Sequence, residues 1–359
     1  MSGTLYCEKI SCYDRPAEPV SVSIPLARGR LQEPSGLSIR DAAGRTLPLQ
    51  RHVLASWDDG SIKWLQVHFQ PDLPGNADAT LTVEVAPGAA DPAPERRVTV
   101  VEGEGGLRVD TGPLAFTVSA DGYWPIQDVA LDGRPLFGRR PFGGFALTLG
   151  GEPLTTAGPV NLEVQEAGPL RVVIEVRGKH RRGDGGEMID LRGRITAYAG
   201  KPYIEVEHQF VHTAEAEELP LEALELAFRP EAAGPAHVAL GQGYYRTAIT
   251  ESDDSVAMLL DAETMLYQAN EHYIDCFYGD FWVDWRDAQG GLALSVYQAH
   301  QHFPKALLAD GEGILCSLWP RDMVPAPTLR GMGKTHRLLL HVHGPDTPLE
   351  DLSVRSLQF

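Results

Sequence analysis

Residues 56–69 read Ser-Trp-Asp-Asp-Gly-Ser-Ile-Lys-Trp-Leu-Gln-Val-His-Phe, a tight turn followed by an alternating strand. Asp58-Asp59-Gly60 predicts the turn, because Asp and Gly tolerate the backbone angles that short hairpins require. Successive side chains of a strand point to opposite faces. The two faces here carry Ile62, Trp64, Gln66 and His68 on one side and Lys63, Leu65, Val67 and Phe69 on the other. We therefore predict a β-hairpin with one aromatic and polar face and one apolar face.

The same pattern of strand and turn continues along the chain. Residues 14–100 contain short alternating segments separated by Gly, Pro and Asp, which is typical of a small barrel or sandwich. After residue 97 the segments lengthen, as a large curved sandwich requires. The long segments are Leu170–Arg177, Met188–Tyr198 and Tyr203–His212. We predict an all-β protein, a small barrel or sandwich followed by a large antiparallel β-sandwich, with one short helix within Asp253–Tyr267.

The length of 359 residues indicates two domains, because single cores stop growing at about 250–300 residues. Residues 87–96 are rich in Pro, Ala and Gly, which favours a linker over a helix or a strand. We expect an N-terminal barrel over residues 1–90, a central sandwich over residues 97–345 and a C-terminal tail over residues 346–359.

The net charge of −18 argues against nucleic acid and anionic membranes as partners. It does not exclude an anionic sugar, since a local cationic cluster acts within a screening length of about 8–10 Å. The N-terminus lacks a signal-peptide core and no segment has the ~18 apolar residues of a membrane span, so we expect a cytoplasmic protein. The four cysteines fit no zinc pattern, so we expect no metal or cofactor, with calcium left open.

A first candidate site lies on neighbouring strands in the middle of the chain. Glu205 and Glu207 alternate with His208 on one strand, and Arg194 lies on the strand before it. Carboxylate, imidazole and guanidinium groups so arranged could hold a uronic acid and abstract a proton beside its carboxylate. The alternative is ion pairing between strands on a solvated sheet face.

A second candidate site is the aromatic segment from residue 244 to residue 286. Sugars bind aromatic faces flanked by polar groups, so this segment could form a glycan surface. Simple packing in the core is the alternative. The residues in question are Tyr244, Tyr245, Arg246, His272, Tyr273, Trp282 and Trp285.

A third polar group combines His300, His302 and Lys305 with Lys334 and His336. His300-x-His302 on a strand would place both imidazoles on one face, a geometry that metals accept. No third ligand stands at a defined spacing, so the metal interpretation is weak.

Several stretches resemble one known family. They are Val22-Ser-Ile-Pro-Leu-Ala-Arg-Gly-Arg-Leu, Trp57-Asp-Asp-Gly-Ser-Ile-Lys-Trp-Leu, Gly168-Pro-Leu-Arg-Val-Val-Ile-Glu-Val, Val206-Glu-His-Gln-Phe and Gly333-Lys-Thr-His-Arg-Leu-Leu-Leu. The chain resembles the exo-rhamnogalacturonan lyases (polysaccharide lyase family 26) in their N-terminal RIFT barrel and central β-sandwich. The strands also resemble the supersandwich of sugar mutarotases. Members of the lyase family carry an (α/α) toroid after these two domains, which this sequence does not include. Two alternatives stay open: a natural short form, or a fragment of a longer protein that has the toroid.

The resemblance implies a protein that binds or cleaves uronic-acid-containing glycans. If it is a lyase, we expect β-elimination, with a Tyr or His removing the C5 proton while an Arg neutralises the carboxylate. Two alternatives stay open: a mutarotase- or epimerase-like enzyme, or a non-catalytic module that binds a glycan, a toroid-bearing partner or a second copy of itself. The catalytic candidates are His208, His272, Tyr273, Arg194 and Lys334, and the substrate-binding candidates are Tyr244, Tyr245, Arg246, Trp282, Trp285 and His302.

Overall fold

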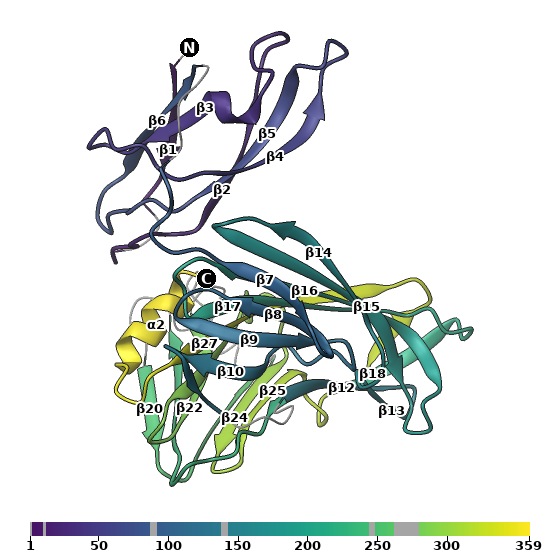
Figure 1. Ribbon diagram of the computed structural model, residues 1–359. Helices are drawn as coiled ribbons and strands as arrows, with labels where there is room; N and C mark the ends of the chain where they lie inside the picture. The colour runs from purple at the N-terminus through teal and green to yellow at the C-terminus, as the bar shows by residue number, and fades with distance from the viewer. Residues whose placement is uncertain (1, 10–11, 87–91, 138–142, 244–247, 262–279) are drawn as a thin grey trace, which may run out of the picture. The chain divides into compact units, whose positions relative to one another are not determined.

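The computed structural model describes residues 2–9, 12–86, 92–137, 143–243, 248–261 and 280–359 (Figure 1). The chain forms two compact units. Unit 1 comprises Met1–Val98 and Gly168–Val172, and unit 2 comprises Thr99–Ala167 and Val173–Phe359. Strands dominate both, which confirms the predicted all-β class. Part of the expected linker, residues 87–91, lies outside the described residues.

Unit 1 contains two small antiparallel sheets, with strand orders β1-β6-β3 and β2-β5-β4 among the described residues. A short 3₁₀ turn at Pro34–Gly36 precedes β3. The strands are β1 (Ser2–Cys7), β2 (Val20–Pro25), β3 (Leu37–Arg40), β4 (Gln50–Ser56), β5 (Ile62–Phe69) and β6 (Ala79–Val85).

The predicted hairpin at residues 56–69 is confirmed, because β4 and β5 pair across it. Gly60 has a φ of +82°, and the Trp57 amide donates a 2.7 Å hydrogen bond to the Ser61 carbonyl. Leu65 and Val67 of the apolar face are completely buried in the core of unit 1, whereas Trp64 on the other face is exposed.

Unit 2 contains a five-stranded sheet, ordered β11-β10-β9-β8-β7, and a sheet that joins sixteen described strands. The path of the larger sheet is β20-β19-β22-β23-β27-β17-β16-β15-β13-β12-β18-β25-β24-β21, with β14 on β15 and β26 on β18. The strands up to β16 are β7 (Thr99–Gly103), β8 (Gly106–Asp110), β9 (Leu114–Ser119), β10 (Gln127–Leu131), β11 (Arg134–Pro135), β12 (Gly143–Leu149), β13 (Glu152–Thr155), β14 (Asn161–Ala167), β15 (Arg171–Arg181) and β16 (Glu187–Tyr198). The later strands are β17 (Tyr203–Val211), β18 (Glu218–Phe228), β19 (His237–Gly243), β20 (Ala248–Ser252), β21 (Ser255–Leu260), β22 (Asp280–Arg286), β23 (Gly291–Val296), β24 (Lys305–Asp310), β25 (Gly313–Trp319), β26 (Ala326–Leu329) and β27 (Gly333–His343).

Strand β17 lies between β16 and β27 and pairs with both without a register shift. Along β17 the buried residues Val206, His208 and Phe210 alternate with the partly exposed Glu205 and Glu207. We call the buried side the inner face and the solvated side the outer face. The alternation of polar and apolar residues along β17 therefore reflects one packed face and one solvated face of the sheet.

Two elements near the ends of unit 2 differ from the sequence-based expectation. Residues 255–260 form strand β21, paired with β24, within the segment 253–267 that was expected to hold a short helix; residues 262–267 of that segment lie outside the described residues. Within residues 346–359 the structure has helix α2 (Leu349–Leu357), which packs against β22. None of the described helices is long and apolar enough to cross a membrane.

We expect Gly193→Ala to destabilise unit 2, because a Cβ at Gly193 would lie 2.4 Å from Cζ of the buried Tyr123 ring. Overpacking of this kind costs about 1–3 kcal/mol of unfolding free energy. Gly183→Ala, in the turn that joins β15 to β16, is the matched control because no atom lies within 4 Å of the point that its Cβ would occupy. Urea unfolding followed by circular dichroism measures both, and equal stability of the two variants would contradict this packing.

Candidate functional site

The structure separates two of the predicted catalytic residues. Arg194 lies on the outer face, where its guanidinium is 3.2 Å from the Glu207 carboxylate on β17. His208 is the next residue along β17 and therefore points to the inner face. The first candidate site thus divides into two surfaces that do not act on one sugar ring.

The outer face is a ladder of interacting charges. The Tyr198 hydroxyl donates a 3.0 Å hydrogen bond to Glu205, and Arg337 on β27 donates one of 3.1 Å to the other oxygen of the same carboxylate. Arg337 also stacks over the Tyr297 ring at 4.5 Å. Opposite charges here satisfy one another, which matches the alternative of ion pairing across a solvated sheet face.

His208 is completely buried in the core of unit 2. Its ring stacks on Phe145 at a centroid distance of 4.1 Å, and its Nε2 lies 3.2 Å from Nε2 of the equally buried His180. Burial lowers the pKa of His208 well below 6.5, and the charges of His180 and His336 lower it further. The side chain is therefore a neutral core group with no surface to offer a glycan.

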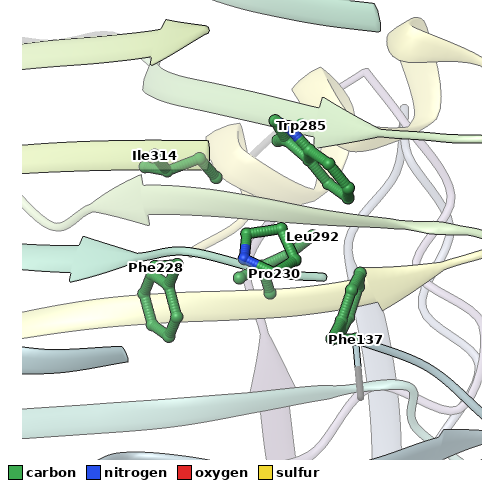
Figure 2. A pocket seen from close by; sticks show the side chains of 6 residues that line it. All are labelled: Phe137, Phe228, Pro230, Trp285, Leu292 and Ile314. Carbon is green, nitrogen blue, oxygen red and sulfur yellow. The ribbon is translucent and has the colours of Figure 1, made fainter. Parts of the chain in front are cut away.

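The two tryptophans expected to bind sugar also lie in the core. Trp282 is completely buried, and its indole N–H donates a 2.9 Å hydrogen bond to Asp280. Trp285 lines a small apolar pocket together with five other apolar side chains, and its ring meets Phe137 edge-on (Figure 2). The others are Phe228, Pro230, Leu292 and Ile314. Both tryptophans are almost completely buried and have no ring face exposed to a sugar, so packing accounts for both.

The remaining aromatic candidates of the second group, with their basic neighbours, cannot be placed. Tyr244, Tyr245, Arg246, His272 and Tyr273 all lie outside the described residues.

The third polar group contains the residues that the structure brings together. Lys334 Nζ lies 2.9 Å from His302 Nδ1. Lys305 Nζ donates hydrogen bonds to the backbone carbonyls of His302 and Pro304. Burial lowers the pKa of His336 well below 6.5, and the charges of Lys305, Lys334 and His302 lower it further. We name Lys334, His302, Lys305 and His336 the cationic cluster.

Strand register explains how these side chains meet. Lys334 pairs with Phe210 and His336 pairs with His208, which places both on the inner face at the start of β27. Lys305 opens β24, where it shares the buried face of the strand with Leu307 and Ala309 and is only 1 % exposed. The cationic cluster therefore lies at one end of the sandwich interior. Its solvent exposure decreases from the exposed Lys334 through His302 to the buried Lys305.

The electrostatics of the cationic cluster are unusual for so acidic a chain. None of its four side chains pairs with a carboxylate of the described residues. Burial lowers the pKa of Lys305 to about 7. Burial also lowers the pKa of His302, to which the charges of Lys334 and Lys305 add. Cations gathered without counter-charge in a partly dry site form a place where an anion is stabilised.

Sequence reasoning placed Lys334 and His302 among its candidates but left Lys305 and His336 out of them. Both stood in the third polar group, yet their burial depends on long-range pairing that sequence does not display. His300 lies in a turn rather than on a strand, so the predicted two-histidine face is wrong. Among the residues that the structure describes, no three potential metal ligands gather.

Comparison with known proteins agrees with the two-unit architecture. Residues 13–83 match the family model of the PcRGLX-like N-terminal RIFT barrel domain, and residues 151–238 match that of the PcRGLX-like protein central beta sandwich domain. Both matches agree with the predicted resemblance in an N-terminal RIFT barrel and a central β-sandwich. It is also 25% identical over 202 residues to the uncharacterized protein YetA of Bacillus subtilis (strain 168). That match covers 53% of this chain and 22% of YetA, so the chain spans about a fifth of this relative.

Two solved structures share the fold. An α-mannosidase from Enterococcus faecalis V583 superposes with a TM-score of 0.59 at 11% identity, over 96% of this chain and 43% of that one. A glycosyl hydrolase family 38 protein from Enterococcus faecalis gives 0.57 at 10% identity, over 98% and 45%. At such identities the likeness concerns the fold alone. The matched family models indicate a carbohydrate-related function.

We expect Lys305→Met to change how stability depends on pH. The pKa of Lys305 is about 7 in the folded chain and about 10.4 when unfolded, so between these values the unfolded state holds more protons. As the pH rises between these two values, Lys305 therefore adds up to about 1.4 kcal/mol per pH unit to the free energy of unfolding. Lys305→Met loses that contribution.

Urea unfolding at about pH 7.5 and about pH 8.5 compares the wild type with Lys305→Met. Both values lie between the folded and unfolded pKa of Lys305. A shallower pH slope in Lys305→Met is the expected result. Parallel slopes would contradict an uncompensated Lys305.

Proposed function

We propose that this protein binds uronic-acid-containing glycans through the cationic cluster, with a sugar carboxylate held by Lys334 and His302. One observation carries the proposal: two lysines and two histidines gather in unit 2 without a carboxylate partner among the described residues, in a chain of net charge −18. Elsewhere on the sheet, cations such as Arg194 have carboxylate partners. A site that concentrates positive charge in an acidic protein is suited to a local anion rather than to a polyanionic surface.

The gradation of burial in the cationic cluster suits this role. Lys334 is exposed and His302 is half-buried, so their nitrogens can meet a ligand. A carboxylate that accepts hydrogen bonds from both would form charge-assisted contacts, which are roughly twice as strong as neutral ones. Lys305 lies behind them in a low-dielectric interior, where its positive charge acts on the ligand with little screening. His336 beside it is a neutral imidazole, because its pKa lies well below 6.5.

The same arrangement would favour β-elimination. In that reaction a base takes the C5 proton, the freed electron pair forms the C4–C5 double bond, and the C4–O glycosidic bond breaks. Neutralising the carboxylate lowers the pKa of the C5 proton and stabilises the charge that develops as it leaves. The cationic cluster supplies this neutralisation, and we propose elimination as the reaction if the protein is catalytic.

We expect the chain to bind oligogalacturonate in calorimetry, and Lys334→Ala to weaken binding at least tenfold, the effect of about 1.4 kcal/mol. Lys179→Ala is the matched control, because Lys179 of unit 2 is paired with Asp190 at 2.5 Å. The methyl-esterified oligomer should not compete, since it lacks the charge. Equal binding of the ester, or by Lys334→Ala, would refute the carboxylate site.

The same oligomers test the reaction. Ultraviolet absorbance that rises during incubation, and fails to rise with Lys334→Ala, would show elimination at the cationic cluster. Binding without any change in absorbance would make the protein a glycan-binding module.

We expect uronate binding to strengthen as the pH falls from about 8 to about 6, because the pKa of Lys305 is about 7 and that of His302 lies below 6.5. More of the cationic cluster is charged at the lower pH, whereas the uronate carboxylate stays ionised. An anion raises these pKa values, so binding should take up protons. Calorimetry in buffers of different ionisation enthalpy measures the uptake, and Lys305→Met should reduce it. An affinity that does not vary with pH would contradict the expectation.

A further inference from the structure

The exposed face of the β2-β5-β4 sheet in unit 1 presents an aromatic side chain beside a row of neutral polar groups. Trp64 on β5 is 39 % exposed and pairs in register with Pro25 on β2 and Ala55 on β4. Two residues farther along, Gln66 pairs with Ser23 on one side and His52 on the other. Residues two apart on a strand point the same way, which places Trp64 with Gln66 and Pro25 with Ser23 on one face. On β4 a register shift between Val53 and Ala55 lets His52 and Ala55 both pair with that face.

The polar row has its hydrogen-bonding capacity available. None of the side chains of Ser23, Gln66 and His52 hydrogen-bonds to another described residue, and none is buried. No charged residue stands in this row or in the row of Trp64. By contrast, the next row is occupied: His68 is buried against Ser21, and Gln50 bonds to the Gly168–Val172 segment.

From this geometry we infer that unit 1 carries a second binding site, for a neutral sugar of a glycan chain, with Trp64 as the stacking platform. The CH face of a pyranose is apolar and packs on an indole ring, while its hydroxyls need neutral donors and acceptors beside the ring. The row from Ser23 through Gln66 to His52 crosses three strands and spans about 10 Å. The absence of charge matches an uncharged ligand and distinguishes this site from the cationic cluster.

The size of the apolar surface argues against a protein as the occupant. Trp64 is flanked in its row by the small side chains of Pro25 and Ala55, and then by the polar row. A protein docking surface would instead use the apolar side chains Val53 and Leu54, which are also exposed on β4. A sugar would therefore depend on Trp64, whereas a protein would depend on Val53 and Leu54. Substitutions at these positions distinguish the two occupants.

Affinity electrophoresis of the full chain in native gels that contain galactan, mannan or glucan tests the site. These polysaccharides carry no carboxylate, so the result does not depend on the cationic cluster. We expect at least one of them to retard the protein, and Trp64→Ala to lose affinity at least tenfold. Gln66→Ala should lose less, and Trp64→Phe should retain part of the retardation because it keeps a ring.

Leu54→Ala is the matched control, since Leu54 is 49 % exposed on the same hairpin but cannot stack on a sugar. It should bind as the wild type does. Circular dichroism confirms that each variant is folded, which is expected for exposed positions. The inference is overturned if none of the three polysaccharides retards the wild type, if Trp64→Ala is retarded equally, or if Leu54→Ala loses as much as Trp64→Ala.

Discussion

The register of β17 between β16 and β27 determines which polar side chains of unit 2 can act together. It sends Arg194 and Glu207 to the outer face, where opposite charges neutralise one another. It sends Lys334 and His336 to the inner face, where they pair with Phe210 and His208 and meet no carboxylate of the described residues. The uncompensated charge of the cationic cluster is therefore a consequence of strand pairing, and every functional argument for unit 2 depends on it.

A buried cation without an opposite charge beside it lowers the stability of the folded state. Proteins keep such destabilising groups mainly at functional sites. Lys305 illustrates this, because its nearest polar partners are the backbone carbonyls of His302 and Pro304 rather than a carboxylate. A carboxylate ligand near Lys334 would supply the missing charge. Ligand binding and folding stability should therefore be coupled through the same four side chains. The neutral face around Trp64 carries no such cost and suits a weaker, uncharged contact.

Local signals were enough to predict the β class, the Asp59-Gly60 hairpin and the aromatic-polar face of β5. They also placed Lys334 and His302 among the candidates. They failed where long-range packing decides: His208 and Trp282 have the chemistry of site residues but are buried by strands distant in sequence. Strand β21 contains good helix formers, yet pairing with β24 overrides that propensity. Alternation predicts that a strand has two faces, but only the assembled sheet shows which one is buried.

A crystal structure of this chain soaked with galacturonic acid tests the central claim most directly. We predict that the sugar carboxylate lies within hydrogen-bonding distance, about 2.7–3.2 Å, of Lys334 Nζ and a ring nitrogen of His302. The same soak with galactose should leave the cationic cluster without sugar. Galacturonate bound elsewhere with the cluster empty, or galactose bound there equally well, would contradict a site built for a carboxylate.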